Sequence, residues 1–280
     1  MIAQSYGGNP PRFVGMMNLY NAILCISKPG PLEDMLVTKN KYIDKDGFIK
    51  LQFQKFLGES SLMVKNGVEQ ARKRKLIGSG FYKDKMLKMV EIIKKCVADK
   101  AASLEERYLK SGQTFDIIAE LDELHTRIIM TSAFGQENVA DIKLPYIENG
   151  HKLMMSLGNA LRDIFLYIAF RGMRYEISII PYLLFFWYSS KDRECIKNIK
   201  TVRDFCRDLI EKRRLEGKKG GGDLLSILME DEEGFSTEVI IDECITFFLA
   251  GSQTVKVTNA NILQHVTRND QVRDRLMKEL

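Results

Sequence analysis

The chain has 280 residues, of which 45% are hydrophobic and 28% charged, a composition that excludes an intrinsically disordered protein and allows a large apolar core. The formal net charge is +5, and basic and acidic residues are interspersed along most of the chain, so nucleic acid is not an expected partner. The five cysteines are scattered, without a Cys-x-x-Cys pair or a histidine at metal-finger spacing. We therefore expect reduced thiols, no metal ligands and a cytosol-facing protein.

The N-terminal segment has no basic stretch followed by an apolar run, so a secretory signal is not predicted. The most apolar window, Ile179–Tyr188, contains Pro181 and is too short to span a bilayer. We interpret this window as buried core. Contact with a membrane surface is the alternative, because aromatic-rich apolar segments suit that interface.

Strand character is predicted only near the N-terminus, where Leu19–Ser27 can pair with the preceding Pro11–Met17. Beyond it, apolar residues recur three and four positions apart, which predicts a mainly α chain. A flexible connection at Glu216–Gly222 is not a domain boundary, so residues 1–280 are expected to form a single domain. The predicted helices are Leu32–Asn40, Val68–Gly80, Lys83–Leu109, Phe115–Phe134, Leu144–Phe170, Asp192–Arg214 and Asp223–Glu230.

A long central helix is predicted from Thr237 to about Val266, capped by Ser236 and roughly 40 Å or more in length. Its middle carries the unusual run Ala-Gly-Ser-Gln-Thr at 250–254. Glycine within a helix costs about 1 kcal/mol relative to alanine, and Ser and Thr compete with the backbone for hydrogen bonds. Helical spacing predicts that Gly251 and Thr254 face one apolar cavity.

This helix resembles the central oxygen-binding helix of eukaryotic cytochrome P-450, the haem-thiolate monooxygenase family. The family pattern Ala-Gly-x-Asp/Glu-Thr is matched at Ala250, Gly251 and Thr254, while Gln253 stands where an acid is usual. The resemblance implies haem as the cofactor. The small residues Ala250 and Gly251 would let the backbone approach it, Thr254 would guide a proton, and Gln253 would hold a water in an altered relay.

Two further segments resemble the same family in the same order. Asn66–Phe81 is similar to its Trp-x-x-x-Arg helix, with Arg74 at the arginine and Gln70 at the tryptophan. Ile23–Lys45 is similar to the strand and helix that open the catalytic domain. The resemblance implies a charge-assisted hydrogen bond from Arg74 to a haem propionate and a neutral one from Gln70. For the neighbouring basic residues we expect an ordinary solvated surface; these are Arg72, Lys73 and Lys75.

The resemblance implies a partial cytochrome P-450 fold with a small N-terminal β hairpin and a long central helix. It also implies insertion of one oxygen atom into a lipophilic organic substrate. Electrons would come from an NADPH-dependent flavoprotein reductase or a small electron-transfer protein. A full-length relative would lie on the cytosolic face of the endoplasmic reticulum membrane, although no anchor is seen in this sequence. The alternative function is a non-catalytic all-α remnant that binds lipophiles or a partner protein.

One departure from the family concerns the axial ligand. The motif Phe-x-x-Gly-x-Arg-x-Cys-x-Gly does not occur, and none of the five cysteines lies in a Gly-Arg context, so no axial ligand is assigned. We interpret the chain as a middle portion of the enzyme. By itself it is expected to be a poor monooxygenase and to aggregate through open strand edges and uncovered apolar helix faces.

Overall fold

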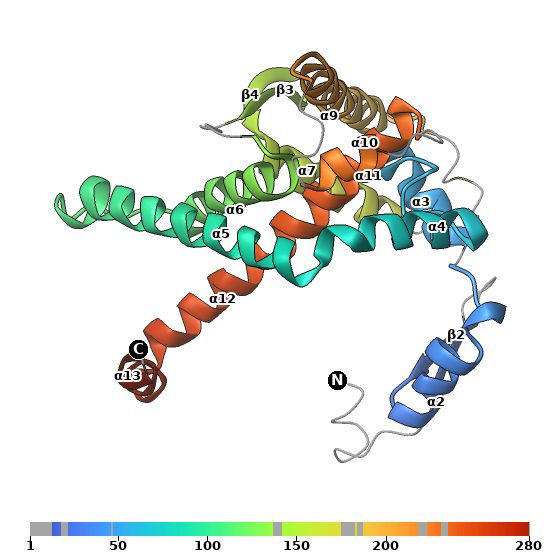
Figure 1. The fold of residues 1–280 in the computed structure, drawn as a ribbon, viewed down its shortest axis with the longest axis horizontal. Coiled ribbons are helices and arrows are strands. Elements are labelled where there is room, and N and C mark those ends of the chain that lie inside the picture. Colours follow the sequence, from blue (N-terminus) through green and yellow to red (C-terminus); the bar gives the residue numbers. More distant parts are fainter. Residues whose placement is uncertain are drawn as a thin grey trace.

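A computed structural model describes residues 13–17, 22–45, 47–136, 142–174, 183, 187–217, 223–230 and 235–279. The interpretation of Ile179–Tyr188 as buried core falls largely outside these residues. The described chain is mainly helical, with two small antiparallel sheets (Figure 1). Across these ranges, no helix combines the length and the hydropathy that crossing a bilayer requires.

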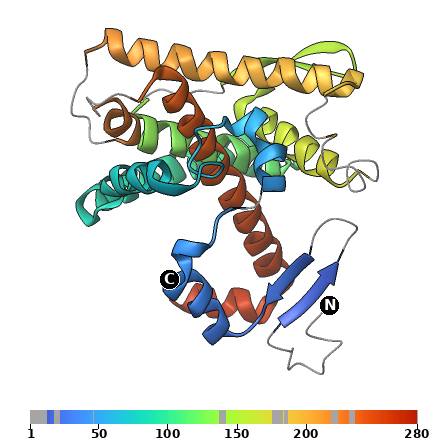
Figure 2. The same ribbon diagram turned by 90° about the vertical axis from the view of Figure 1, so that its right-hand side faces the viewer.

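The N-terminal hairpin was predicted and is confirmed. Strand β1 (Phe13–Met17) pairs with β2 (Ala22–Ile26), and Phe13 lies opposite Ile26. Three short helical segments follow: α2 (Pro29–Glu33), η1 (Asp34–Thr38) and η2 (Asn40–Tyr42). The two views show β1, β2 and α2 lying apart from the main helical body (Figures 1 and 2).

Most predicted helices are present in the main body. Their bounds are α4 (Gly67–Gly78), α5 (Lys83–Leu104), α6 (Ile117–Phe134), α7 (Leu157–Gly172), α9 (Ser190–Leu215), α10 (Leu224–Met229), α11 (Thr237–Phe248), α12 (Thr254–Arg268) and α13 (Asp270–Glu279). Shorter segments of other helical types are η3 (Ser79–Phe81), η4 (Glu105–Leu109) and η6 (Leu249–Gln253). Helix α3 (Gly47–Leu57) was not predicted.

The helix predicted over Leu144–Phe170 is wrong in its first part. Residues there form a second hairpin, β3 (Lys143–Glu148) and β4 (His151–Ser156), joined by Asn149 and Gly150. These two residues have φ angles of 50° and 82°, as the Asn-Gly turn of a tight hairpin requires. Helix α7 begins only after Ser156, whose side chain caps its first turn by accepting from the Asn159 N–H.

The core is built around α11. Its residues Ile241, Cys244 and Ile245 have no exposed surface. They pack within a hydrophobic cluster to which α3, α6, α7, α9 and α10 also contribute residues. Phe248 at its end stacks on Phe134 of α6 with ring centroids 4.4 Å apart. The predicted course of a long helix through the middle of the protein is therefore confirmed for its first half, α11.

The second half of the central helix has different surroundings. Helix α12 extends away from the helical body (Figures 1 and 2), and of its residues, all of them described, Lys256 alone is buried. A small hydrophobic cluster between α5 and α6 contains Cys96, Leu121 and Leu124, with Ala260 of α12 packed against it. The unusual run of residues 250–254 therefore lies where the central helix leaves the core.

Candidate functional site

The central helix is interrupted by one wide turn. Residues Leu249–Gln253 adopt a π-helical conformation between α11 and α12. Two side-chain hydroxyls bond back to carbonyls around it: Ser252 Oγ donates to Phe248 O at 2.6 Å and Thr254 Oγ1 to Ala250 O at 2.7 Å. Single π turns inside α-helices recur at functional sites, and here hydroxyl-bearing residues supply hydrogen bonds where the α-helical ladder opens.

The wide turn changes which residues share a face. Ala250 and Thr254 are exposed, whereas Gly251 is half-buried. A Cβ added to Gly251 would lie 2.7 Å from Ile129 Cδ1 of α6, so that position points into the helix packing. The prediction that Gly251 and Thr254 face one cavity is wrong, because the 3.6-residue spacing does not hold across a π turn. Thr254 lies on an open face of the described chain, with Ala250 beside it.

The opposite side of the turn is held by polar contacts with α6 and α7. Gln253 Nε2 donates to the Gly158 carbonyl at 2.7 Å. One turn later, the buried ammonium of Lys256 lies 2.6 Å from Asp122 Oδ1, and Ser156 donates to the other oxygen of Asp122 at 2.9 Å. These contacts fix the rotation of the π turn and keep the Gln253 amide away from the face that Thr254 occupies.

Replacing Gln253 with glutamate should destabilise the folded chain by about 1–3 kcal/mol at neutral pH, since a carboxylate cannot donate to the Gly158 carbonyl. A protonated carboxyl can donate. The folded-state pKa of the new group should therefore lie above the unfolded value, and the lost stability should return as the pH falls. Urea unfolding at about pH 5 and about pH 8 measures this difference. The Gln253→Met variant is the control, and equal losses for Gln253→Glu at both pH values would contradict the assignment.

The predicted cofactor-binding residues Gln70 and Arg74 lie four residues apart on α4, hence on one side of that helix. Arg74 is exposed and Gln70 half-buried. Within the described residues, neither makes a hydrogen bond or an ion pair. Burial lowers the pKa of the Lys45 ammonium, and although Glu243 opposes this, the Arg74 guanidinium lowers it further. Arg74 is thus an exposed cation without a hydrogen bond or ion pair among the described residues, available to an anionic group.

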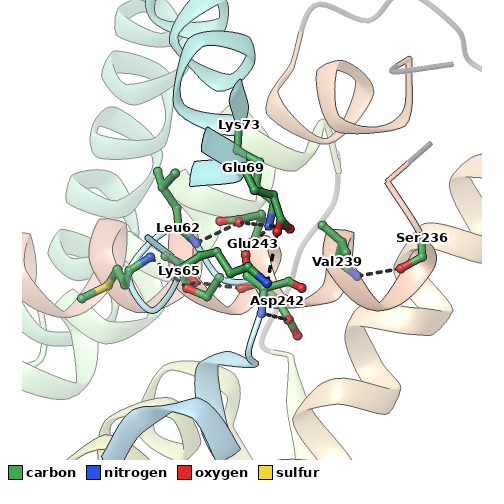
Figure 3. A network of polar contacts seen from close by, with 12 residues as sticks. Leu62, Lys65, Glu69, Lys73, Ser236, Val239, Asp242 and Glu243 are labelled. Carbon is green, nitrogen blue, oxygen red and sulfur yellow. Dashed lines mark hydrogen bonds and ion pairs between the residues drawn. The ribbon is translucent and has the colours of Figure 1, made fainter. Parts of the chain in front are cut away.

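Lys73, the neighbour of Arg74, was expected on a solvated surface and is instead completely buried. Its ammonium donates to the Ser60 carbonyl and lies 3.4 Å from Glu243 Oε1 of α11 (Figure 3). Glu243 also accepts from the Leu62 N–H at 2.9 Å. Burial raises the pKa of Glu243, while the Leu62 N–H and Lys73 act in the opposite direction.

Asp242, the residue before Glu243, also binds the loop of residues 58–62, to which Ser60 and Leu62 belong. It accepts from the Ser60 N–H at 3.1 Å and from Arg203 of α9 at 2.8 Å. Burial raises its pKa, and Arg203 lowers it. Gly58 makes the approach possible: its φ is +85°, and a Cβ there would overlap the Asp242 carboxylate at 1.9 Å. Two consecutive carboxylates therefore attach loop 58–62 to the central helix, and sequence analysis missed them. The signal was an Asp-Glu pair inside an apolar helical run.

The cysteines of the described chain are not arranged as metal ligands. Those at 96, 195, 206 and 244 are buried, and Cys25 is half-buried in β2. Burial raises the pKa of Cys195 and of Cys206 to about 12 and raises those of Cys96 and Cys244. A thiol that stays protonated is a poor ligand. Among the described residues, no group of three or more His, Cys, Asp or Glu side chains is placed to hold a metal ion.

Comparison with known proteins gives the family. The sequence profile of the cytochrome P450 family matches residues 7–280. The chain belongs to the cytochrome P450 family. Cytokinin hydroxylase of Arabidopsis thaliana is 24% identical over 94% of this chain and 50% of its own length. Secologanin synthase 1 of Catharanthus roseus is 25% identical over 90% of this chain and 47% of its own length. This cytochrome P450 chain spans about half the length of these curated relatives.

Solved cytochrome P450 structures share the fold. The retinoic acid-bound cyanobacterial CYP120A1 aligns with a TM-score of 0.70 at 14% identity, over 99% of this chain and 57% of the other. CYP102L1 aligns with a TM-score of 0.68 at 19% identity, over 94% of this chain and 57% of the other. The predicted mainly α, partial cytochrome P450 fold is confirmed by these alignments.

The family uses haem, a flat and largely apolar group with two carboxylates, and the described residues offer small and apolar side chains at the π turn and an exposed cation on α4. The face of the π turn carries the small side chains of Ala250 and Thr254, and Val255 and Val257 beyond it are 45% and 53% exposed. Arg74 supplies a cation without a hydrogen-bonding partner among the described residues. Lys73 ties the helix of Arg74 to Glu243, which lies on the same central helix as Thr254. Along that helix Glu243 and Thr254 are separated by roughly 16 Å at 1.5 Å per residue.

Proposed function

We propose that this chain is part of a haem-dependent monooxygenase that inserts one atom of dioxygen into a lipophilic organic substrate. The observation that carries the proposal is the open face at the π turn, where Ala250 and Thr254 stand exposed while Gln253 and Lys256 are held behind them. Solved structures of the same fold contain progesterone in a zebrafish protein and retinoic acid in a cyanobacterial one. Both ligands are lipophilic, which supports the substrate class.

Arg74 and Gln70 would hold the haem through its propionates. A guanidinium donates two parallel hydrogen bonds to a carboxylate, and Gln70, one turn earlier on α4, adds a neutral donor. When bound, haem supplies the activation of dioxygen and the transfer of one oxygen atom. The basic face around Arg74 would also receive an acidic electron-transfer partner, such as an NADPH-dependent flavoprotein reductase.

Thr254 would hold the proton closest to the reacting oxygen. Its hydroxyl donates to the Ala250 carbonyl at 2.7 Å, so it must leave that bond before it can donate elsewhere. Gln253 cannot act as an acid, and its amide is engaged with the Gly158 carbonyl. We assign Gln253 the task of positioning the π turn, so that the proton moves through Thr254 and the solvent on its open face.

The test is a haem titration of the whole chain, followed by absorbance. Replacing Arg74 with glutamine should weaken haem binding by about 10- to 100-fold, since a hydrogen bond to a charged group contributes about 1.5–3 kcal/mol. Lys75→Gln, an exposed basic neighbour on the same helix, is the matched control and should bind haem like the unchanged protein. Equal affinities for the two variants would overturn the role of Arg74. A chain that takes up a lipophile and no haem would favour the non-catalytic alternative.

A further inference from the structure

Helix α4 has little apolar surface to fix its rotation. Of its twelve residues, only Lys73 and Ile77 are buried. A surface helix is normally oriented by an apolar stripe that repeats every three or four residues. Here Ile77 is the one buried apolar residue of the helix, Leu76 is half-buried, and the other buried position is a lysine. The rotation of α4 about its axis therefore depends on what holds the Lys73 ammonium.

That ammonium is surrounded by partners from three segments (Figure 3). It donates to the Ser60 carbonyl, lies 3.4 Å from Glu243 Oε1, and lies 3.9 Å from Glu69 one turn earlier on α4. The Phe235 ring is 5.7 Å away. The side chains of Lys73 and Glu243 are 1% and 0% exposed, so the attraction between them is little screened by solvent.

Glu243 is itself incompletely satisfied. Its Oε1 accepts from Leu62 and lies near Lys73, whereas its Oε2 is buried without a hydrogen bond among the described residues. Apolar residues in place of a buried ion pair are often neutral or stabilising. A gain in folding stability is therefore a weak explanation for the buried Lys73–Glu243 pair, and fixing the orientation of α4 is a better one.

We infer that the Lys73–Glu243 pair positions Arg74 for the cofactor by fixing the rotation of α4 against the central helix. This inference deepens the proposed function and rests on it. Adjacent residues of an α-helix point about 100° apart, so anchoring Lys73 inward fixes the direction of Arg74 about 100° away from the buried side. The exposed, uncommitted state of Arg74 agrees with this geometry. Lys73 and Glu243 act through Arg74 and do not themselves touch the cofactor.

The test removes both charges of the pair and keeps side chains of similar shape. The double variant Lys73→Met/Glu243→Gln has no buried unpaired charge, and the glutamine oxygen can still accept from the Leu62 N–H. A control, Lys100→Met/Glu120→Gln, removes another buried pair between α5 and α6, with an N–O distance of 2.8 Å. In this second network Lys100 also pairs with Glu123, and Glu120 also accepts from Arg107 and Tyr108. Thermal unfolding of both variants tests whether they fold.

The first readout is a double-mutant cycle on haem affinity. We expect Lys73→Met/Glu243→Gln to weaken haem binding about tenfold, within the range of residues coupled in one network. Combined with Arg74→Gln, it should weaken binding no further than Arg74→Gln alone. Additive losses, or an unchanged affinity in the folded double variant, would overturn the positioning role.

The second readout does not need haem. Spin labels at Arg74→Cys and Thr254→Cys, in a Cys25→Ser background that leaves only buried thiols, report the distance between α4 and the π turn. The distribution should shift and broaden in the Lys73→Met/Glu243→Gln variant and stay unchanged in the control. An unchanged distribution would refute the inference. If the unmodified chain binds no haem, the proposed function fails while this measurement still decides the inference.

Discussion

Replacing Asp122 with asparagine should destabilise the folded chain by about 3–5 kcal/mol, as expected when one partner of a buried ion pair is removed. The Lys256 ammonium lies 2.6 Å from Asp122 Oδ1, and the two side chains are 2% and 4% exposed. Asparagine keeps the shape but leaves a buried ammonium without a counter-charge. Urea unfolding at neutral pH measures the loss as a fall in the transition midpoint.

The control for this prediction removes the second charge as well. Adding Lys256→Met to Asp122→Asn should recover most of the stability, because methionine follows the path of the lysine stem without a charge. Ser156 can still donate to the asparagine oxygen that replaces its present acceptor. A loss below about 1 kcal/mol for Asp122→Asn would mean that the pair behaves like one on the surface.

Replacing Gly58 with alanine should cost about 3 kcal/mol or more, from two causes. A left-handed backbone costs a residue with a Cβ about 1–2 kcal/mol, and the φ of Gly58 is +85°. The new methyl group would also overlap the Asp242 carboxylate at 1.9 Å. That carboxylate is held by the Ser60 N–H and Arg203, so moving it breaks two further hydrogen bonds.

Gly112 provides the matched comparison for Gly58. Its φ is +66°, and nothing lies within 4 Å of the position that a Cβ would occupy. Gly112→Ala should therefore show only the backbone cost of about 1–2 kcal/mol. The two unfolding free energies are compared under the same conditions. If both variants lose the same stability, the Asp242 carboxylate does not constrain Gly58.

The sequence was most informative where one local pattern decided the structure. Helical spacing gave α5, α6 and α9, and the capping residue Ser236 gave the start of α11. The same reasoning failed at β3 and β4, because the spacing from Leu144 outweighed the Asn149-Gly150 turn signal. Local cues competed there, and the wrong one was preferred.

Long-range pairing could not be predicted in the same way. The sequence drew attention to residues 250–254 but gave no sign of the π turn, which depends on the fit of α11 against its neighbours. In the sequence Lys73 resembles its neighbouring surface cations, because Glu243, the acid with which it pairs in the core, is 170 residues away. Among the predicted site residues, Arg74 and Thr254 are exposed, with the Thr254 hydroxyl bonded to the Ala250 carbonyl, while Gly251 and Gln253 turn toward α6 and α7.

The attachment of loop 58–62 to α11 also sets an order of events during synthesis. The Leu62 N–H and its Glu243 acceptor are 181 residues apart in the chain, and Lys73 and Glu243 are 170 apart. At about 5–20 residues per second, a ribosome needs roughly 10 to 35 s to add the residues between Lys73 and Glu243. Through that interval the lysine stays hydrated and the loop has no acid to bind. Helix α4 can therefore take its final rotation only after the central helix has left the exit tunnel.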